Sequence, residues 1–247
     1  MRSRTVVARL IGALALVSGS PAVAQGDWLF AAYGGAAHTH SSTVTLTLPA
    51  QQTQLEIGGV EYRGQSFQSP QYYGLRVAWI PDGRRWLGIE GEWIHAKVYA
   101  DTDRSVHVRG TLRSAAIDAA VPLSSFVQRL AMSHGLNFIL VNVAVRRELG
   151  PEDSQGRPRL VAVVRGGAGP MRPHAESDIE GVARDQYEWG GLGAQAGAGL
   201  ELSLGRGIGA LGEYKFTWSS PEIDVAGGRA TIPARSHHVA FGVQYRF

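Results

Sequence analysis

The sequence predicts an all-β protein, an eight-stranded antiparallel up-and-down transmembrane β-barrel. Three observations lead to this fold class. The final residues, 237–247, alternate strictly between apolar and polar or small side chains. The amino terminus has the pattern of a secretory signal, and eight strand-like segments are joined by connections that are alternately short and long. An even number of strands with short turns at one end and long loops at the other is typical of barrels in the bacterial outer membrane.

The final strand presents one apolar face. Val239, Phe241, Val243, Tyr245 and Phe247 share one parity, and successive side chains of a strand point to opposite sides. The segment resembles the closing strand of outer-membrane barrels, in which a terminal Phe is the recognition signal for insertion. This resemblance implies the barrel-assembly machinery as a partner. An ordinary soluble edge strand is the alternative for this segment taken alone.

The amino-terminal residues favour the membrane alternative. Arg2, Arg4 and Arg9 flank a short apolar run, residues 10–17, and an Ala-x-Ala sequence ends at Ala24. These are the parts of a cleavable signal peptide, and the run is shorter than the roughly 20 residues of a membrane-spanning helix. We expect cleavage after Ala24, which makes residues 1–24 the signal peptide and residues 25–247 the barrel. The localisation that follows is the outer membrane of a Gram-negative bacterium, with periplasmic termini and extracellular loops.

Composition excludes several classes of protein. The formal charge of +3 is carried by the three signal-peptide arginines, so the mature chain has no net charge and no basic surplus for nucleic acid. The absence of cysteine excludes thiol catalysis and thiolate metal sites. After the signal, no run approaches 18 consecutive apolar residues, which excludes a helical membrane protein.

The strands are predicted from segments in which apolar residues recur at every second position. They lie near residues 27–37, 71–80, 85–99, 134–148, 159–171, 186–204, 207–219 and 236–247. Short turns are expected near residues 81–84, 149–158 and 205–206, and long polar loops over residues 38–70, 100–133, 172–185 and 220–235. A barrel of eight strands has an interior that side chains fill, so the sequence does not predict a diffusion pore.

The two parities of these strands differ in chemistry. One carries apolar residues for the lipid, with tryptophans at both predicted membrane boundaries. The other carries charges that should point into the lumen and neutralise one another as ion pairs. These inward charges are Arg76, Glu90, Glu92, Arg146, Arg165, Glu201, Glu213, Lys215 and Arg246.

Histidines are confined to the predicted extracellular half of the chain. His95 and His134 lie at the outer ends of strands that are consecutive in the sequence, so the fold should bring them close together. Imidazole can be a neutral metal ligand or an acid–base group. No short metal-binding motif is present, so the prediction of His95 and His134 as metal ligands depends on topology.

Several motifs resemble those of one family. They are residues 66–76 (SFQSPQYYGLR), 95–100 (HAKVYA), 134–137 (HGLN), 167–170 with Pro173-His174, and 213–215 (EYK). The chain is similar along nearly all of its mature length to the lipid A oxidase-like barrels of Gram-negative outer membranes. This resemblance implies oxidation of the proximal glucosamine of lipid A to 2-aminogluconate with oxygen and a divalent metal. Outer-leaflet lipid A, the lipid portion of lipopolysaccharide, would be the partner.

The resemblance also implies roles for individual residues. A non-haem metal such as iron, held by His95 and His134, would supply the redox chemistry that side chains lack. Glu92 or Asp101 would add a carboxylate, Arg76 and Lys97 would bind phosphate of lipid A, and Tyr99 would orient the sugar. The candidate catalytic residues are Glu92, His95, Lys97, Tyr99, His134 and Asn137.

Two other functions remain open. The chain could be a non-catalytic barrel that stabilises the envelope or binds partners through its long loops. It could also be a lipid A deacylase with a Ser/His/acid site. Ser133-His134 and Ser236-His237 are poor candidates for such a site, because adjacent residues in a strand point to opposite faces.

Overall fold

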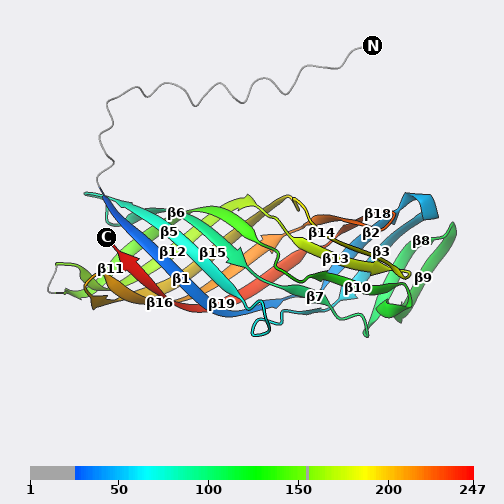
Figure 1. The fold of residues 1–247 in the computed structure, drawn as a ribbon, viewed down its shortest axis with the longest axis horizontal. Helices are drawn as coiled ribbons and strands as arrows, with labels where there is room; N and C mark the ends of the chain where they lie inside the picture. Colours follow the sequence, from blue (N-terminus) through cyan, green and yellow to red (C-terminus); the bar gives the residue numbers. More distant parts are fainter. Residues whose placement is uncertain (1–25, 154–155) are drawn as a thin grey trace, which may run out of the picture.

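Eight antiparallel strands close into a barrel in the order β1–β19–β16–β15–β12–β11–β6–β5, which confirms the predicted fold class (Figure 1). The structure is a computed structural model and describes residues 26–153 and 156–247; the expected signal peptide and its cleavage site lie outside them. The barrel strands are β1 (Gly26–Thr39), β5 (Tyr73–Pro81), β6 (Leu87–His95), β11 (Phe138–Glu152), β12 (Pro158–Pro170), β15 (Leu192–Gly205), β16 (Ile208–Ser219) and β19 (Ala234–Arg246). Among the described residues, no helix is long and apolar enough to cross a membrane.

The last strand closes the barrel against the first. β19 pairs with β1 from Leu29 opposite Arg246 to Thr39 opposite Ser236. Its predicted apolar parity faces outward, since Phe241 is 68% exposed whereas its neighbour Ala240 is buried. Every barrel strand likewise exposes large apolar side chains on the outside, and some strands, such as β11 with Phe138 and Leu140, also bury apolar side chains on the inside. A closed sheet with an apolar exterior leaves no backbone group unpaired in lipid, which is the architecture of outer-membrane barrels.

The two ends of the barrel differ. Short turns connect β5 to β6, β11 to β12 and β15 to β16 at one end, as the sequence predicts. The described chain begins and finishes at this end, where Trp28 and Phe247 exchange backbone hydrogen bonds of 3.2 and 3.0 Å (Figure 1). All the long connections are therefore at the opposite end.

The sequence predicts that these long connections are polar loops. In the structure they form strands instead. One sheet has the order β14–β13–β10–β7–β4 and the other β17–β18–β2–β3–β8–β9. Their strands are β2 (Ser42–Leu48), β3 (Thr53–Val60), β4 (Tyr62–Arg63), β7 (Val98–Ala100), β8 (Ser105–Leu112), β9 (Ala115–Pro122), β10 (Val127–Met132), β13 (His174–Ile179), β14 (Val182–Tyr187), β17 (Glu222–Val225) and β18 (Gly228–Thr231), with 3-10 turns at Pro49–Gln51 and Leu123–Ser125. In Figure 1 the two sheets extend from the end of the barrel away from the termini.

An apolar core explains why these segments form strands. In β2, Val44, Leu46 and Leu48 alternate with more exposed threonine and serine positions, so one face of the strand is apolar. These side chains belong to a single buried cluster that also contains Val98 and Met132 of the other sheet. Both extension sheets therefore share one core, and the polar residues that suggested loops are their solvent-facing parity.

At the rim, one barrel strand ends earlier than predicted and the next begins later, and both differences shape the site below. β6 stops at His95, after which the chain leaves the barrel and enters β7. β11 begins at Phe138 rather than near residue 134, because Gly135 and Asn137 adopt positive φ angles of 93° and 48°. These angles lie outside the β region, so the preceding residues form a turn at the rim of the barrel.

Candidate functional site

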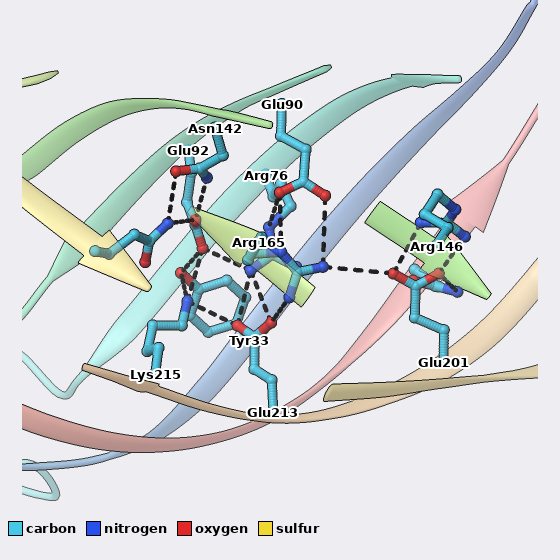
Figure 2. A network of polar contacts seen from close by, with 12 residues as sticks. Tyr33, Arg76, Glu90, Glu92, Asn142, Arg146, Arg165, Glu201, Glu213 and Lys215 are labelled. Atoms are coloured by element: carbon cyan, nitrogen blue, oxygen red, sulfur yellow. Dashed lines mark hydrogen bonds and ion pairs between the residues drawn. The ribbon is translucent and has the colours of Figure 1, made fainter. Parts of the chain in front are cut away.

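The barrel lumen contains a buried network of ion pairs (Figure 2). Glu213 accepts hydrogen bonds from Arg76 at 2.8 Å and also from Arg165. Lys215 Nζ lies 2.7 Å from both Glu92 and Glu213. The remaining members are Glu90, the pair Arg146–Glu201, and the polar partners Tyr33, Asn142 and Gln195.

This network is a plug that balances its own charge. Four cationic side chains, Arg76, Arg146, Arg165 and Lys215, face four carboxylates, Glu90, Glu92, Glu201 and Glu213, as the sequence analysis expects for inward charges. All eight are buried. Buried charges are tolerated only when each is paired and hydrogen-bonded, so the network fills the lumen and holds the barrel wall together.

The lumen position corrects two expected roles. Arg76 is 2% exposed and its guanidinium is surrounded by carboxylates, so it is not placed to bind a phosphate outside the barrel. Glu92 also points inward, three positions before His95 on the same strand. Because an odd separation along a strand puts two side chains on opposite faces, Glu92 cannot join His95 in one site.

A pocket lies on the outside of the barrel where β5, β6 and β11 meet the extension sheets. Its volume is about 450 Å³, and its lining residues are Pro70, Tyr73, Trp93, His95, His134, Asn137, Ile139, Arg172 and Tyr187. Trp93 and Ile139 belong to the apolar exterior and are 38% and 45% exposed. The pocket therefore combines the lipid-facing surface on one side with polar and ionisable groups on the other.

His95 is fixed on the wall of this pocket. Its ring stacks on Tyr73 with centroids 4.8 Å apart, and its Nδ1 lies 3.0 Å from Oδ1 of Asn137. Asn137 in turn donates hydrogen bonds from its amide to the carbonyl oxygens of His134 and Gly135 at 3.0 and 3.1 Å. The Nε2 atom of His95 is buried without a hydrogen-bond partner. The turn that opens β11 thus brings His95, His134 and Asn137 into one pocket, as the order of the strands predicts.

The second histidine contacts a different set of ligand-type groups. His134 Nδ1 lies 3.2 Å from Nδ1 of His174 and 4.0 Å from Oε1 of Glu176, and the last two atoms are 3.8 Å apart. Over the ranges that the structure describes, these three side chains form a group whose ligand atoms all lie within 4.8 Å of one another and that could hold a metal ion. His95 is not a member of this group. The two histidines that the sequence predicts as a pair of ligands therefore have different partners, since His95 contacts Asn137 whereas His134 contacts His174 and Glu176.

Charged neighbours orient this group, which we call the His134–His174–Glu176 cluster. His174 Nε2 lies 2.8 Å from a carboxylate oxygen of Asp185, and Arg129 donates to the other oxygen of Glu176. Burial alone would raise the pKa of Glu176, but hydrogen bonds from Ser133 and Arg129 outweigh it and lower the pKa below its ordinary value. The carboxyl group is therefore ionised at neutral pH.

The other expected site residues lie outside the pocket lining. Lys97 is 3% exposed, and its ammonium donates to the backbone oxygen of Gln68 at 2.9 Å. Burial lowers the pKa of this amine. Tyr99 lies beneath Arg129, with the guanidinium carbon 5.8 Å from its ring centroid, and burial followed by the Glu176 carboxylate raises the pKa of its hydroxyl. Asp101 is taken up by ion pairs with two arginines.

The arginine that lines the pocket is Arg172, whereas the sequence predicts Arg76 and Lys97 as the phosphate-binding residues. It is exposed at the pocket, with its guanidinium carbon 5.6 Å from the ring centroid of Tyr187 and 5.9 Å from that of Trp189. The planar guanidinium of a stacked arginine can bind phosphate and carboxylate groups through two parallel hydrogen bonds. The sequence does not predict His174, Glu176 and Arg172 as site residues, because their segment is typical of a polar loop. The structure shows the buried alternation of β13 that the sequence pattern does not reveal.

A second group of histidines lies elsewhere on the rim of the barrel. His237 of β19 contacts His40 and the hydroxyl of Tyr214 through its two ring nitrogens. His38 packs against His40, with ring centroids 5.7 Å apart. In the part of the chain that the structure describes, no carboxylate contacts these histidines. They therefore offer imidazole ligands alone, whereas the His134–His174–Glu176 cluster also offers a carboxylate.

Comparisons with known proteins find similar folds. No protein-family model matches the chain, and no curated protein sequence does so either. Among solved structures, Neisserial surface protein A is 8% identical, with 90% of this chain and 98% of that chain covered and a TM-score of 0.41. Ail, the attachment invasion locus protein of Yersinia pestis, is 11% identical (90% and 99% covered, TM-score 0.42). OprG from Pseudomonas aeruginosa is 12% identical (90% and 96% covered, TM-score 0.42). At these values the assignment of the fold rests on the strand order and register of the chain itself.

Proposed function

We propose that the chain is an outer-membrane enzyme that modifies lipid A, oxidising the proximal glucosamine to 2-aminogluconate with oxygen and a divalent metal. One observation carries the proposal. The pocket that contains His95, His134 and Asn137 opens on the lipid-facing side of the barrel, next to Trp93 and Ile139. A lipid headgroup can reach such a pocket sideways from the membrane, whereas the lumen is filled by ion pairs.

The orientation of the barrel belongs to this proposal. We place the short turns and the termini in the periplasm and the extension sheets outside the cell, as in barrels with long outer loops. The pocket then lies at the level of the outer leaflet, where lipid A is found. Tyr73, Trp93 and Tyr187 at its edge suit the boundary between hydrocarbon and headgroups, because their rings are amphipathic.

The residues divide the work of binding and proton transfer. Arg172 presents a charged edge to an anionic group of the headgroup, and the aromatic side chains support the face of a sugar ring. His95 has a free buried Nε2 that can accept a proton from a sugar hydroxyl, and Asn137 holds its other nitrogen. A bound divalent metal would supply the two-electron chemistry with oxygen that these side chains lack.

A hydrolytic function is a second candidate, favoured by one contact. The Oγ of Ser133 lies 3.1 Å from Nδ1 of His174, whose Nε2 lies 2.8 Å from Asp185. This is the order of a Ser/His/acid triad, reached through His174 rather than through the adjacent His134. Ser133 does not line the pocket, however, and a nucleophile must reach its substrate. A non-catalytic barrel is equally consistent with the fold.

Mass spectrometry of lipid A distinguishes the three functions. Lipid A from a strain that produces the protein is compared with lipid A from a strain that lacks the gene. An increase of about 16 mass units is expected for the oxidase, because C1 gains one oxygen as it passes from the aldehyde to the acid level. Loss of an acyl chain supports the hydrolase, and an unchanged profile leaves the non-catalytic barrel. The variants His95→Ala and Arg172→Gln should reduce oxidation, and the lipid-facing variant Val243→Ala, on the remote strand β19, is the matched control.

A further inference from the structure

We infer that His134, His174 and Glu176 form a divalent transition-metal site, with Asp185 and Arg129 orienting its ligands. The inference deepens the proposed function and rests on it only for what the metal does. It also replaces the pair His95–His134 as the ligand set. Two imidazoles and one carboxylate are the donors that non-haem iron, cobalt and zinc prefer over calcium or magnesium.

The spacing of the ligand atoms suits such an ion. His134 Nδ1, His174 Nδ1 and Glu176 Oε1 form a triangle with sides of 3.2, 3.8 and 4.0 Å. The point equidistant from all three atoms is about 2.1 Å from each, since that is the circumradius of the triangle. Distances of about 2.0–2.2 Å are those of imidazole and carboxylate ligands on zinc. The three atoms therefore need little rearrangement to share one ion.

The ligand atoms of the cluster can all turn lone pairs to one point. A carboxylate only accepts, so the 2.8 Å contact with Asp185 makes His174 Nε2 the donor and leaves Nδ1 as an acceptor in the neutral ring. Glu176 Oε1 is a second acceptor at the same point. Without an ion, the hydroxyl of Ser133 can donate to Glu176 Oε1, and His134, with its proton on Nδ1, can donate to His174 Nδ1 at 3.2 Å. With its proton on Nε2 instead, His134 offers a third lone pair, and a cation would take the place of both donated protons.

The surroundings have the form that metal ligands require. Histidine ligands almost always donate their second N–H to a carboxylate or carbonyl, which fixes the ring, and Asp185 does this for His174. Arg129 binds the outer oxygen of Glu176 and leaves the inner one for the ion. His174 and Glu176 are largely covered, with side-chain exposures of 11% and 16%, whereas His134 is 54% exposed and lines the pocket. His174 and Glu176 would hold the ion on the covered side of the cluster, and His134 lies on the side that is open to the pocket.

The test is direct metal binding by the full-length barrel, refolded in detergent and freed of metal. Cobalt(II) or zinc(II) alone is titrated in, with calorimetry for affinity, elemental analysis for stoichiometry and cobalt absorption for ligand type. We expect one equivalent to bind. His174→Ala and Glu176→Gln should weaken binding by at least about 100-fold, and Asp185→Asn by about 10–100-fold, as for other carboxylates that hydrogen-bond to a metal-bound histidine. His237→Ala, on the other histidine group, is the matched control and should bind like the parent.

Two outcomes overturn the inference. One is no stoichiometric binding by the folded parent protein. The other is unchanged binding in His174→Ala and Glu176→Gln, with loss in His95→Ala or His237→Ala. Heat-modifiable migration on gels shows in each case that the barrel of the variant has folded. The proposed function and the metal site can be refuted independently of each other. Metal binding with an unchanged lipid A profile refutes the oxidase but not the site, whereas undiminished oxidation by a His174→Ala variant that has lost metal shows that the oxidase does not use this site.

Discussion

Removal of one carboxylate from the lumen should destabilise the barrel strongly. Glu213 lies 2.8 Å from Arg76 and 2.7 Å from Lys215 and also binds Arg165, and all four side chains are at most 2% exposed. Glu213→Gln keeps the shape of the side chain but leaves one positive charge without a counter-charge. Breaking a buried ion pair by removing one partner costs about 3–5 kcal/mol, because the remaining charge stays desolvated. We expect the free energy of unfolding to fall by that amount.

The measurement is urea unfolding of the refolded protein in lipid vesicles, followed by tryptophan fluorescence and extrapolated linearly to zero urea. Glu148→Gln is the matched control, because Glu148 lies on a barrel strand but pairs with Arg85 at 3.4 Å on the surface, with exposures of 40% and 43%. Such a pair contributes about 0–1 kcal/mol. The double variant Glu213→Gln/Lys215→Met restores charge balance and should be more stable than Glu213→Gln. A Glu213→Gln barrel as stable as the Glu148→Gln control would refute the account of the lumen.

Two further predictions concern the rim. Gly135→Ala should reduce lipid A oxidation. A Cβ at this position, where φ is 93°, would lie 2.4 Å from Nδ1 of His95 and would displace that ring. A variant with the parent's lipid A profile would contradict the placement of His95 in the site. Glu176 has a lowered pKa in the folded protein, so its stabilising contribution is fully present above its ordinary value of 4.5 and is lost as the pH falls through the lowered value. The difference in unfolding free energy between the parent and Glu176→Gln should therefore shrink as the pH falls below the ordinary value of 4.5, and a difference that grows on acidification would reverse the sign of the shift.

The barrel was predictable because its two environments are so different. On each strand a lipid-facing residue such as Phe241 alternates with a lumen-facing residue such as Ala240, and the period of two is visible without knowledge of any neighbour. The inward charges could be assigned in the same way. Their partners could not, since Glu213 meets Arg76 from a strand 137 residues away, and the sequence does not show which charges share a height in the lumen.

The candidate site was only half predictable. The meeting of His95 with His134 and Asn137 follows from the order of the strands, because consecutive strands end side by side. His174 and Glu176 arrive on β13, which pairs with β10 in an extension sheet and not with any barrel strand. A short strand with alternating polar residues has the same sequence pattern as a loop unless the sheet that packs against it is known. The sequence therefore predicts a loop for the segment that completes the cluster.

Strand β6 shows how stability and chemistry are kept apart in this fold. Glu92 points into the lumen and bonds Arg76 at 2.6 Å, whereas Trp93 and His95 on the other parity line the outer pocket. One strand thus serves both sites through opposite faces, and the wall of the barrel separates them. Substitutions in the lumen should accordingly lower the free energy of unfolding without changing metal affinity, and substitutions in the His134–His174–Glu176 cluster should lower metal affinity without disturbing the ion pairs of the lumen, since sites with no shared partners contribute independently. A lumen variant such as Glu213→Gln that stays folded but loses metal would show that the two faces are coupled, and the pocket could then no longer be treated as a site supported by a rigid wall.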